Sequence, residues 1–104
     1  MPHFIMLMYD VVIEKSQERK FRALDESTQD RIRDVVNEVK RNRQPSSHDK
    51  AKPLRGPTGG LFRLRIGDYR LVCEKDMNQL KIHKLGKRKH VYDNMNELYN
   101  QVDA

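Results

Sequence analysis

The chain has 104 residues, a length that suits one domain with a modest core, and we expect a single domain over residues 1–104. Charged residues make up 35% and hydrophobic residues 37%, but the apolar residues fall in periodic segments, which favours a folded domain over disorder. The longest apolar run, Phe4 to Tyr9, is too short to span a bilayer or to form a signal peptide. We therefore expect a cytoplasmic protein without a membrane partner.

The net charge of +6 is unevenly distributed along the chain. Residues 1–49 hold nine Lys and Arg against nine Asp and Glu, whereas residues 50–92 hold twelve against three, and the last twelve residues hold none against three. A basic excess confined to one part of a chain predicts a polyanionic partner, either nucleic acid or an acidic protein.

The first apolar segment, Phe4 to Ile13, predicts a strand whose core is Tyr9 to Ile13. Residues 1–8 form either the start of this strand or an N-terminal extension. Ser16 could then cap a short helix that runs to Leu24.

A longer second helix is the clearest element in the sequence. Ser27-Thr28-Gln29-Asp30 resembles a capping box. It precedes apolar residues at i, i+3, i+4 and i+7, which are Ile32, Val35, Val36 and Val39. The helix must end before Pro45, and Gln44 to Gly60 is expected to be a connecting loop or to hold one short undetected element.

Three further strands are predicted at Leu61–Ile66, Tyr69 to Glu74 or Lys75, and Gln79–Leu85, followed by a short C-terminal helix from Asn94. The order is strand, helix, helix and three strands. It predicts an α+β fold in which a small, mainly antiparallel β-sheet packs against an N-terminal helical hairpin.

The candidate site begins on the strand Leu61–Ile66. Because side chains alternate along a strand, Phe62, Leu64 and Ile66 take one face while Arg63 and Arg65 share the other. Further polar residues follow at the next turn and after the last strand: Arg70, Lys87, Arg88, His90 and Tyr92. Guanidinium groups bind phosphate and stabilise negative charge on it, and an aromatic ring can stack on a base. These are the groups that single-stranded RNA binding and cleavage need.

Each of these features also has a simpler interpretation. A basic strand face is more often a solvated surface, and Tyr92 would suit a core equally well. Cys73, the only cysteine, is expected to be a buried strand residue, and it allows no intrachain disulfide. The histidines and Cys73 lack zinc-site spacing, so we expect no metal and no cofactor.

Three segments resemble successive signatures of the RelE/ParE toxin superfamily: residues 52–56 (KPLRG), 61–72 (LFRLRIGDYRLV) and 86–92 (GKRKHVY). The resemblance covers most of the chain and implies a RelE-like toxin of a type II toxin–antitoxin pair. Its partners would be a cognate antitoxin and mRNA in the ribosomal A site, next to 16S rRNA, with oligomers formed only through the antitoxin. In RelE-like members the 2′-hydroxyl attacks the adjacent phosphate without a metal.

Carried over by motif, Arg70 would hold the phosphate and stabilise the transition state, and Arg88 would neutralise charge on it. Tyr92 would stack on a base or orient the 2′-hydroxyl. Arg63 and Arg65 stand where RelE has lysines, and arginine does not give up a proton in practice. Other branches of the superfamily place a histidine just before the tyrosine and use it as an acid or base, so the resemblance makes His90 the preferred proton-transfer group.

The resemblance also places Lys52, Arg55 and Lys87 among the RNA-binding residues. Two other functions remain open. A ParE-like toxin would bind and inhibit DNA gyrase without hydrolysing RNA, and an inactive module for binding nucleic acid or protein would need only the charge.

Overall fold

The computed structural model describes residues 3–42, 48–54 and 60–88, and within these ranges it has six strands and two helices. The strands are β1 (Phe4–Met8), β2 (Val11–Glu14), β3 (Ala51–Pro53), β4 (Leu61–Ile66), β5 (Tyr69–Asp76) and β6 (Gln79–Lys87). The helices are α1 (Lys15–Arg22) and α2 (Glu26–Arg41). The α+β class and the three-strand meander agree with the sequence-based prediction.

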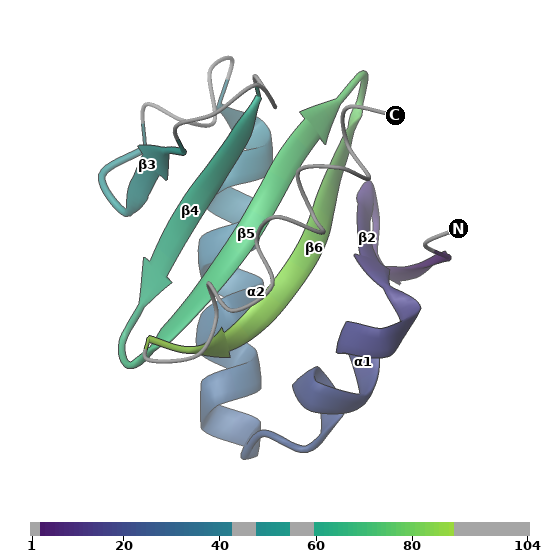
Figure 1. Cartoon of the computed structure of the whole chain (residues 1–104), viewed down its shortest axis with the longest axis vertical. Coiled ribbons are helices and arrows are strands. Elements are labelled where there is room, and N and C mark those ends of the chain that lie inside the picture. The colour runs from purple at the N-terminus through teal and green to yellow at the C-terminus, as the bar shows by residue number, and fades with distance from the viewer. Residues whose placement is uncertain (1–2, 43–47, 55–59, 89–104) are drawn as a thin grey trace.

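One mixed sheet holds all six strands in the order β1-β2-β6-β5-β4-β3 (Figure 1). Every neighbouring pair is antiparallel except β2 and β6, which run parallel with Val11 beside Leu80 and Ile13 beside Ile82. The hydrogen bond from the Leu80 amide to the Asp10 carbonyl, 2.9 Å long, fixes the start of this parallel pair.

The N-terminal region differs from the prediction of one continuous strand. Tyr9 and Asp10 form a turn that splits the segment into the antiparallel strands β1 and β2. Asp10 has a φ of 61°, in the left-handed region that aspartate enters more easily than most residues. Residues 4–8 therefore belong to the sheet as an edge strand.

Helix α2 buries the predicted stripe: Ile32, Val35, Val36 and Val39. The predicted capping box is misplaced, because α2 begins at Glu26 with Asp25 as the residue before it. The hydroxyls of Thr28 and Ser27 donate to the Asp25 carboxylate and lower its pKa. Ser16 likewise lies inside α1, where its hydroxyl donates to Glu14 rather than capping the helix.

The short strand β3 lies in the segment expected to be a loop or to hold one short element. Its residues pair with β4 at the sheet edge, Lys52 opposite Arg63 and Pro53 opposite Phe62. An edge position tolerates Pro53, because a proline has no amide hydrogen to donate to a ladder.

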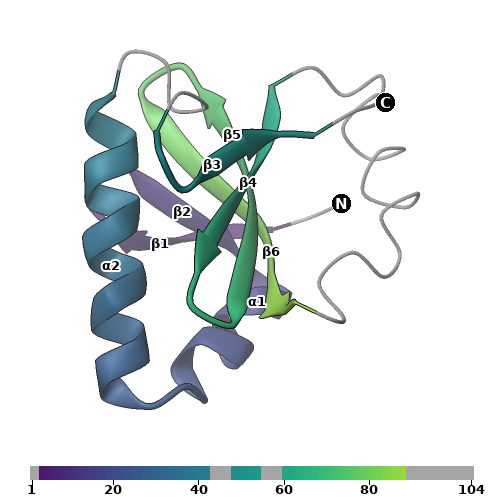
Figure 2. The same cartoon turned by 90° about the vertical axis from the view of Figure 1, so that its left-hand side faces the viewer.

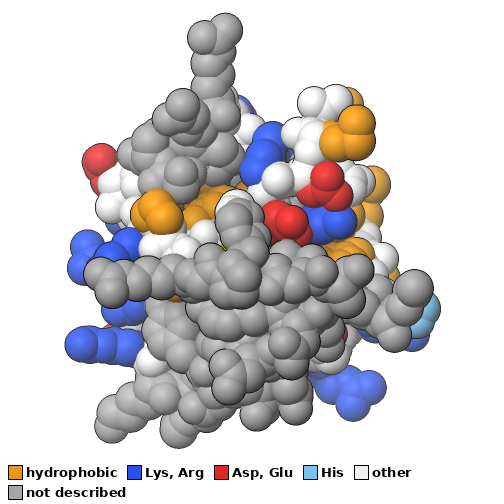
Figure 3. Space-filling model, turned by 45° about the horizontal axis from the view of Figure 1, so that its top comes forward, with side chains coloured by type: hydrophobic (Ala, Val, Ile, Leu, Met, Phe, Trp, Pro, Cys, Tyr) orange, Lys and Arg blue, Asp and Glu red, His pale blue; other side chains and the backbone are white. Residues whose placement is uncertain are grey.

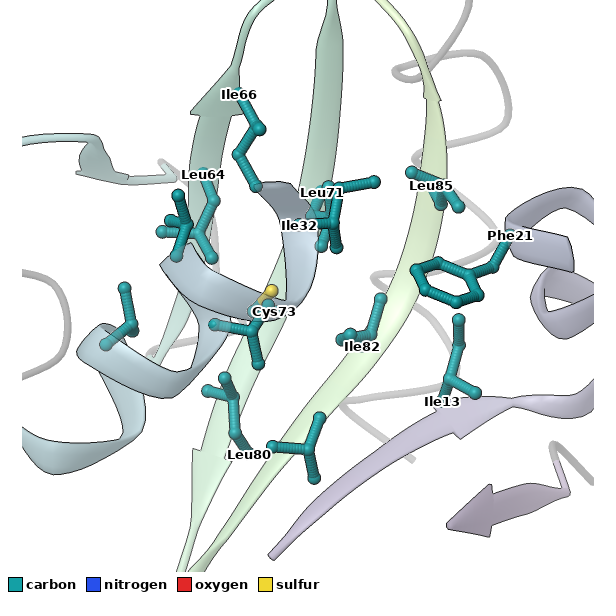
Figure 4. Close-up of a cluster of buried hydrophobic side chains, with 14 of the residues drawn as sticks. Ile13, Phe21, Ile32, Leu64, Ile66, Leu71, Cys73, Leu80, Ile82 and Leu85 are labelled. Carbon is teal, nitrogen blue, oxygen red and sulfur yellow. The ribbon is translucent and has the colours of Figure 1, made fainter. Parts of the chain in front are cut away.

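Both helices contribute to one core on the same face of the sheet. Figure 2 shows α2 covering that face, and Figure 4 shows Phe21 of α1 and Ile32 of α2 pointing toward the side chains of the sheet. Cys73 is fully buried within this core, and burial raises the pKa of its thiol. This agrees with the predicted structural role for the cysteine and leaves it unsuited to be a nucleophile.

The predicted C-terminal helix from Asn94 lies outside the described residues. Neither described helix is long and apolar enough to cross a membrane.

Candidate functional site

Strand β4 presents different chemistry on its two faces. Phe62, Leu64 and Ile66 are buried in the core beside α2. The side chains between them point to the opposite face of the sheet, where Arg63 is half-buried and Arg65 is exposed. We call this opposite side the basic face.

The strand register sets cations directly opposite each other on the basic face. Lys52 of β3 pairs with Arg63 of β4, and Arg65 of β4 pairs with Arg70 of β5. Residues directly opposite in an antiparallel pair share a face, and like charges in such pairs repel. The fold therefore holds two rows of cations that a bound anion would stabilise.

Arg70 is the least exposed of these cations, at 8%. Its Nη1 donates to the carbonyl oxygens of Gly67, at 2.8 Å, and Tyr69, at 2.9 Å. Gly67 has a φ of 60° in the turn between β4 and β5, a conformation that glycine adopts without strain. The turn thus orients the Arg70 guanidinium, which reduces the entropy lost when it binds a phosphate.

Arg88 reaches the same turn from the end of β6. Its amide donates to the Asp68 carbonyl at 2.9 Å, which anchors residue 88 beside the β4–β5 turn. On β5, Arg70 is opposite Gly86 of β6. Because glycine has no side chain, no side chain of β6 stands directly opposite Arg70.

These cations line a groove of about 610 Å³, which we call the basic groove. Its described lining residues are Lys52, Pro53, Leu54, Arg63, Arg65, Arg70 and Arg88. Five of the seven are cationic and none is acidic. In Figure 3, Lys and Arg side chains gather along the left-hand rim, the side on which Figure 1 places β3.

Two carboxylates of β5 are paired with side chains of β6. Glu74 Oε1 lies 2.8 Å from His83 Nε2, and Asp76 Oδ2 lies 2.8 Å from Lys81 Nζ. The His83 ring is nearly buried and also meets the edge of Phe4. The pairing of β5 with β6 brings His83 and Glu74 together.

The groove unites five of the sequence-predicted site residues: Lys52, Arg63, Arg65, Arg70 and Arg88. Lys87 is exposed and is not among the residues that line the groove. Side chains alternate along β6, so Lys87 lies on the same face of the sheet as Leu85, which is the face opposite the groove. Arg55, His90 and Tyr92 lie outside the described residues. Sequence reasoning missed Pro53 and Leu54 as lining residues, since nothing in the sequence placed β3 beside β4.

Among the residues that the structure describes, no group of three or more His, Cys, Asp and Glu side chains could hold a metal ion. The chemistry available in the basic groove is that of fixed positive charge and N–H donors. Such groups bind a polyanion and stabilise negative charge that develops on it.

The structure is thus a small α+β protein with two helices on one face of its sheet and an arginine-rich groove on the other. No family model and no curated protein matches the chain by sequence.

Solved structures do share its fold. A chain from the RelB-RelE antitoxin-toxin complex of Methanococcus jannaschii is 18% identical with a TM-score of 0.61, and the match covers 78% of this chain and 94% of that one. A chain from the archaeal RelE-RelB complex of Pyrococcus horikoshii OT3 is 24% identical with a TM-score of 0.61, over 76% and 93% of the two chains.

A chain from the YoeB-YefM complex of Staphylococcus aureus is 18% identical with a TM-score of 0.63, over 75% and 94% of the two chains. The protein therefore has the fold of the RelE and YoeB toxins, as the sequence motifs led us to expect.

Proposed function

We propose that this protein is the toxin of a type II toxin–antitoxin pair and a metal-independent endoribonuclease that cleaves mRNA on the ribosome. The observation that carries the proposal is the convergence of Arg65, Arg70 and Arg88 on one groove that has no acidic lining residue among those described. The shared fold supports the class of protein, and the groove supports a phosphate-containing substrate.

In the proposed reaction the 2′-hydroxyl oxygen of one nucleotide attacks the adjacent phosphorus and loses its proton, while the bond to the 5′-oxygen breaks and that oxygen gains a proton. Negative charge increases on the non-bridging oxygens in the transition state. Arg70 and Arg88 stabilise that charge, and the carbonyls of Gly67 and Tyr69 hold Arg70 in place for this role.

Arginine stays protonated at any relevant pH, so the groove arginines do not serve as the base. His90 is the proposed proton-transfer group and Tyr92 the proposed partner of a base or of the 2′-hydroxyl. Both assignments rest on their place in the Gly-Lys-Arg-Lys-His-Val-Tyr motif.

A cognate antitoxin is the proposed protein partner. The matched RelE and YoeB chains were solved in complex with RelB or YefM. An antitoxin of acidic and apolar residues would neutralise the two rows of cations on the basic face and block entry of RNA.

Primer extension on translated transcripts tests the proposal. Expression of the wild-type chain should arrest growth and leave cut transcripts. Arg70→Ala and Arg88→Ala should each lower the cleavage rate roughly a hundredfold, the effect of losing one transition-state donor worth about 3 kcal/mol.

The matched control is Arg41→Ala, which removes an exposed cation at the end of α2 and should leave cleavage unchanged. Uncut transcripts together with induced DNA damage would replace the proposal by the gyrase-inhibitor alternative. Uncut transcripts without DNA damage would leave only a binding module.

A further inference from the structure

The two edge strands of the sheet, β1 and β3, differ in their protection against pairing with another chain. An edge strand presents unpaired amide and carbonyl groups, and natural proteins guard such edges with charged residues or proline. β3 has both, since two of its three residues are Lys52 and Pro53. β1 has neither, because all five of its residues, Phe4–Met8, are apolar. It is the one strand without a charged residue among those that the structure describes.

The pairing of β1 with β2 shows which backbone groups of β1 point outward. The Lys15 amide donates to the His3 carbonyl at 2.6 Å, which marks these two residues as a hydrogen-bonded pair. Hydrogen-bonded and non-hydrogen-bonded pairs alternate along an antiparallel ladder, so Phe4 and Met6 belong to pairs of the second kind. Their amide and carbonyl groups therefore point away from β2, toward the side of β1 where no described strand lies.

The side chains of β1 are complementary to a second copy of the same strand. The ladder with β2 is regular from Phe4 to Met6 and shifts its register between Met6 and Met8, so the regular stretch is centred on Ile5. Met6 is 65% exposed although it is large and apolar. In an antiparallel pairing of two copies centred on Ile5, each Met6 stands opposite the partner's Phe4. A methionine sulfur packs favourably against an aromatic ring, so this pairing covers the exposed side chain on both copies.

Charge and symmetry select a second copy as the occupant of this edge. An acidic partner is attracted to the basic face, whereas the uncharged β1 lets two chains of net charge +6 meet without bringing like charges together. Antiparallel pairing of identical strands is two-fold symmetric and uses the unguarded edge of both copies. Both outer edges of the joined sheet are then β3, where Lys52 and Pro53 resist further pairing. Assembly therefore stops at a dimer.

We propose that two copies of this chain form a dimer by antiparallel pairing of their β1 strands, with Ile5 at the two-fold axis and one continuous sheet across both copies. This contact adds to the oligomers expected through an antitoxin, and it does not rest on the proposed function. So short a contact buries less surface than a standard stable interface, and the dissociation constant is roughly 10–100 μM. None of the described lining residues of the basic groove comes from β1 or β2, so the dimer contact is separate from the groove.

Sedimentation velocity of the full-length wild-type chain tests the association. Over concentrations from about 2 to 200 μM, which bracket the expected dissociation constant, the chain should shift from monomer to dimer. Met6→Lys places a charge on the edge strand, as natural edges do, and should weaken the dimer at least about tenfold. The matched control is Met77→Lys, which changes a residue that is 90% exposed between β5 and β6 and should leave the dimer unchanged.

Paired cysteines test the register. Residue 4 of one copy and residue 6 of the other should have Cα atoms about 5.5 Å apart, within the range of a disulfide. The two residues 6 lie diagonally, at about 7–8 Å, which is too far. A mixture of Phe4→Cys and Met6→Cys chains should therefore give several-fold more disulfide-linked dimer under mild oxidation than Met6→Cys alone. Cys73 does not interfere, because it is fully buried.

A wild-type chain that stays monomeric at the highest concentration would overturn the proposal, and so would a dimer that Met6→Lys leaves intact. Equal cross-linking in the mixture and in Met6→Cys alone would overturn the pairing centred on Ile5. The cleavage assay gives a separate answer, since Met6→Lys should cut transcripts as the wild type does. A dimer with uncut transcripts would retain the β1 contact and reject the nuclease, and a monomer with cut transcripts would do the reverse.

Discussion

The two faces of the sheet come from the same strands, but they present opposite chemistry. On β4 the buried face carries Leu64 and the basic face carries Arg65, its neighbour in sequence. Leu64 is excluded from water in the core, whereas Arg65 is exposed opposite another cation. Because alternation along a strand separates the two faces, stability and the proposed RNA binding can be altered independently at neighbouring residues.

The largest effect on stability is expected from the buried face. Leu64→Ala should lower the free energy of unfolding by about 3 kcal/mol, because the residue is fully buried and its removal leaves a cavity. Urea unfolding followed by circular dichroism measures the change. A loss below about 1 kcal/mol would mean that the core beside α2 collapses around the cavity or is packed more loosely than the structure indicates.

An intermediate effect is expected at the turn where the two faces meet. Gly67→Ala forces a side chain into the left-handed region and brings its Cβ within 3.3 Å of Arg31 Nη1, so we expect a loss of roughly 1–2 kcal/mol. The same change should reduce RNA binding, because a backbone shift that relieves the strain moves the residue 67 carbonyl that holds Arg70. Thermal unfolding together with a binding titration on the same sample checks both parts. Normal binding in a destabilised variant would mean that the turn keeps its backbone conformation or that binding does not depend on the orientation of Arg70.

The smallest effect on stability is expected from the basic face. Arg65→Ala should change the free energy of unfolding by no more than about 0.5 kcal/mol, because the side chain is exposed and packs into no core. The same urea titration serves as the measurement. A loss above 1 kcal/mol would mean that Arg65 stabilises the fold, and would contradict the separation of the two faces.

Much of the fold is predictable because its signals are local. The apolar stripe from Ile32 to Val39 follows the helical period, and the strands β4 and β5 alternate around the Gly67-Asp68 turn. Two features could not be located from the sequence, for physical reasons. The break at Tyr9-Asp10 has no Gly or Pro to mark it, and β3 has only three residues, one of them Pro53.

The candidate site was predictable in composition and less so in geometry. Alternation alone puts Arg63 and Arg65 on one face, and the turn puts Arg70 near them. The strand register that sets Lys52 opposite Arg63 cannot be read from the sequence. The hydrogen bond from the Arg88 amide to the Asp68 carbonyl cannot be read from it either. It also gave no signal that Arg70 would be nearly buried, because that burial depends on the folded turn and its neighbours.

The parallel pairing of β2 with β6 has a kinetic consequence. The β4–β5–β6 meander and the β1–β2 hairpin each form from neighbouring segments, but the bond between Leu80 and Asp10 joins opposite ends of the described chain. Long loops make such contacts slow to form, so the meander should assemble before β2 docks on it. A chain emerging from the ribosome therefore completes its core only after β6 has been made, and the strands that carry Arg63, Arg65 and Arg70 are among the last described strands to be synthesised.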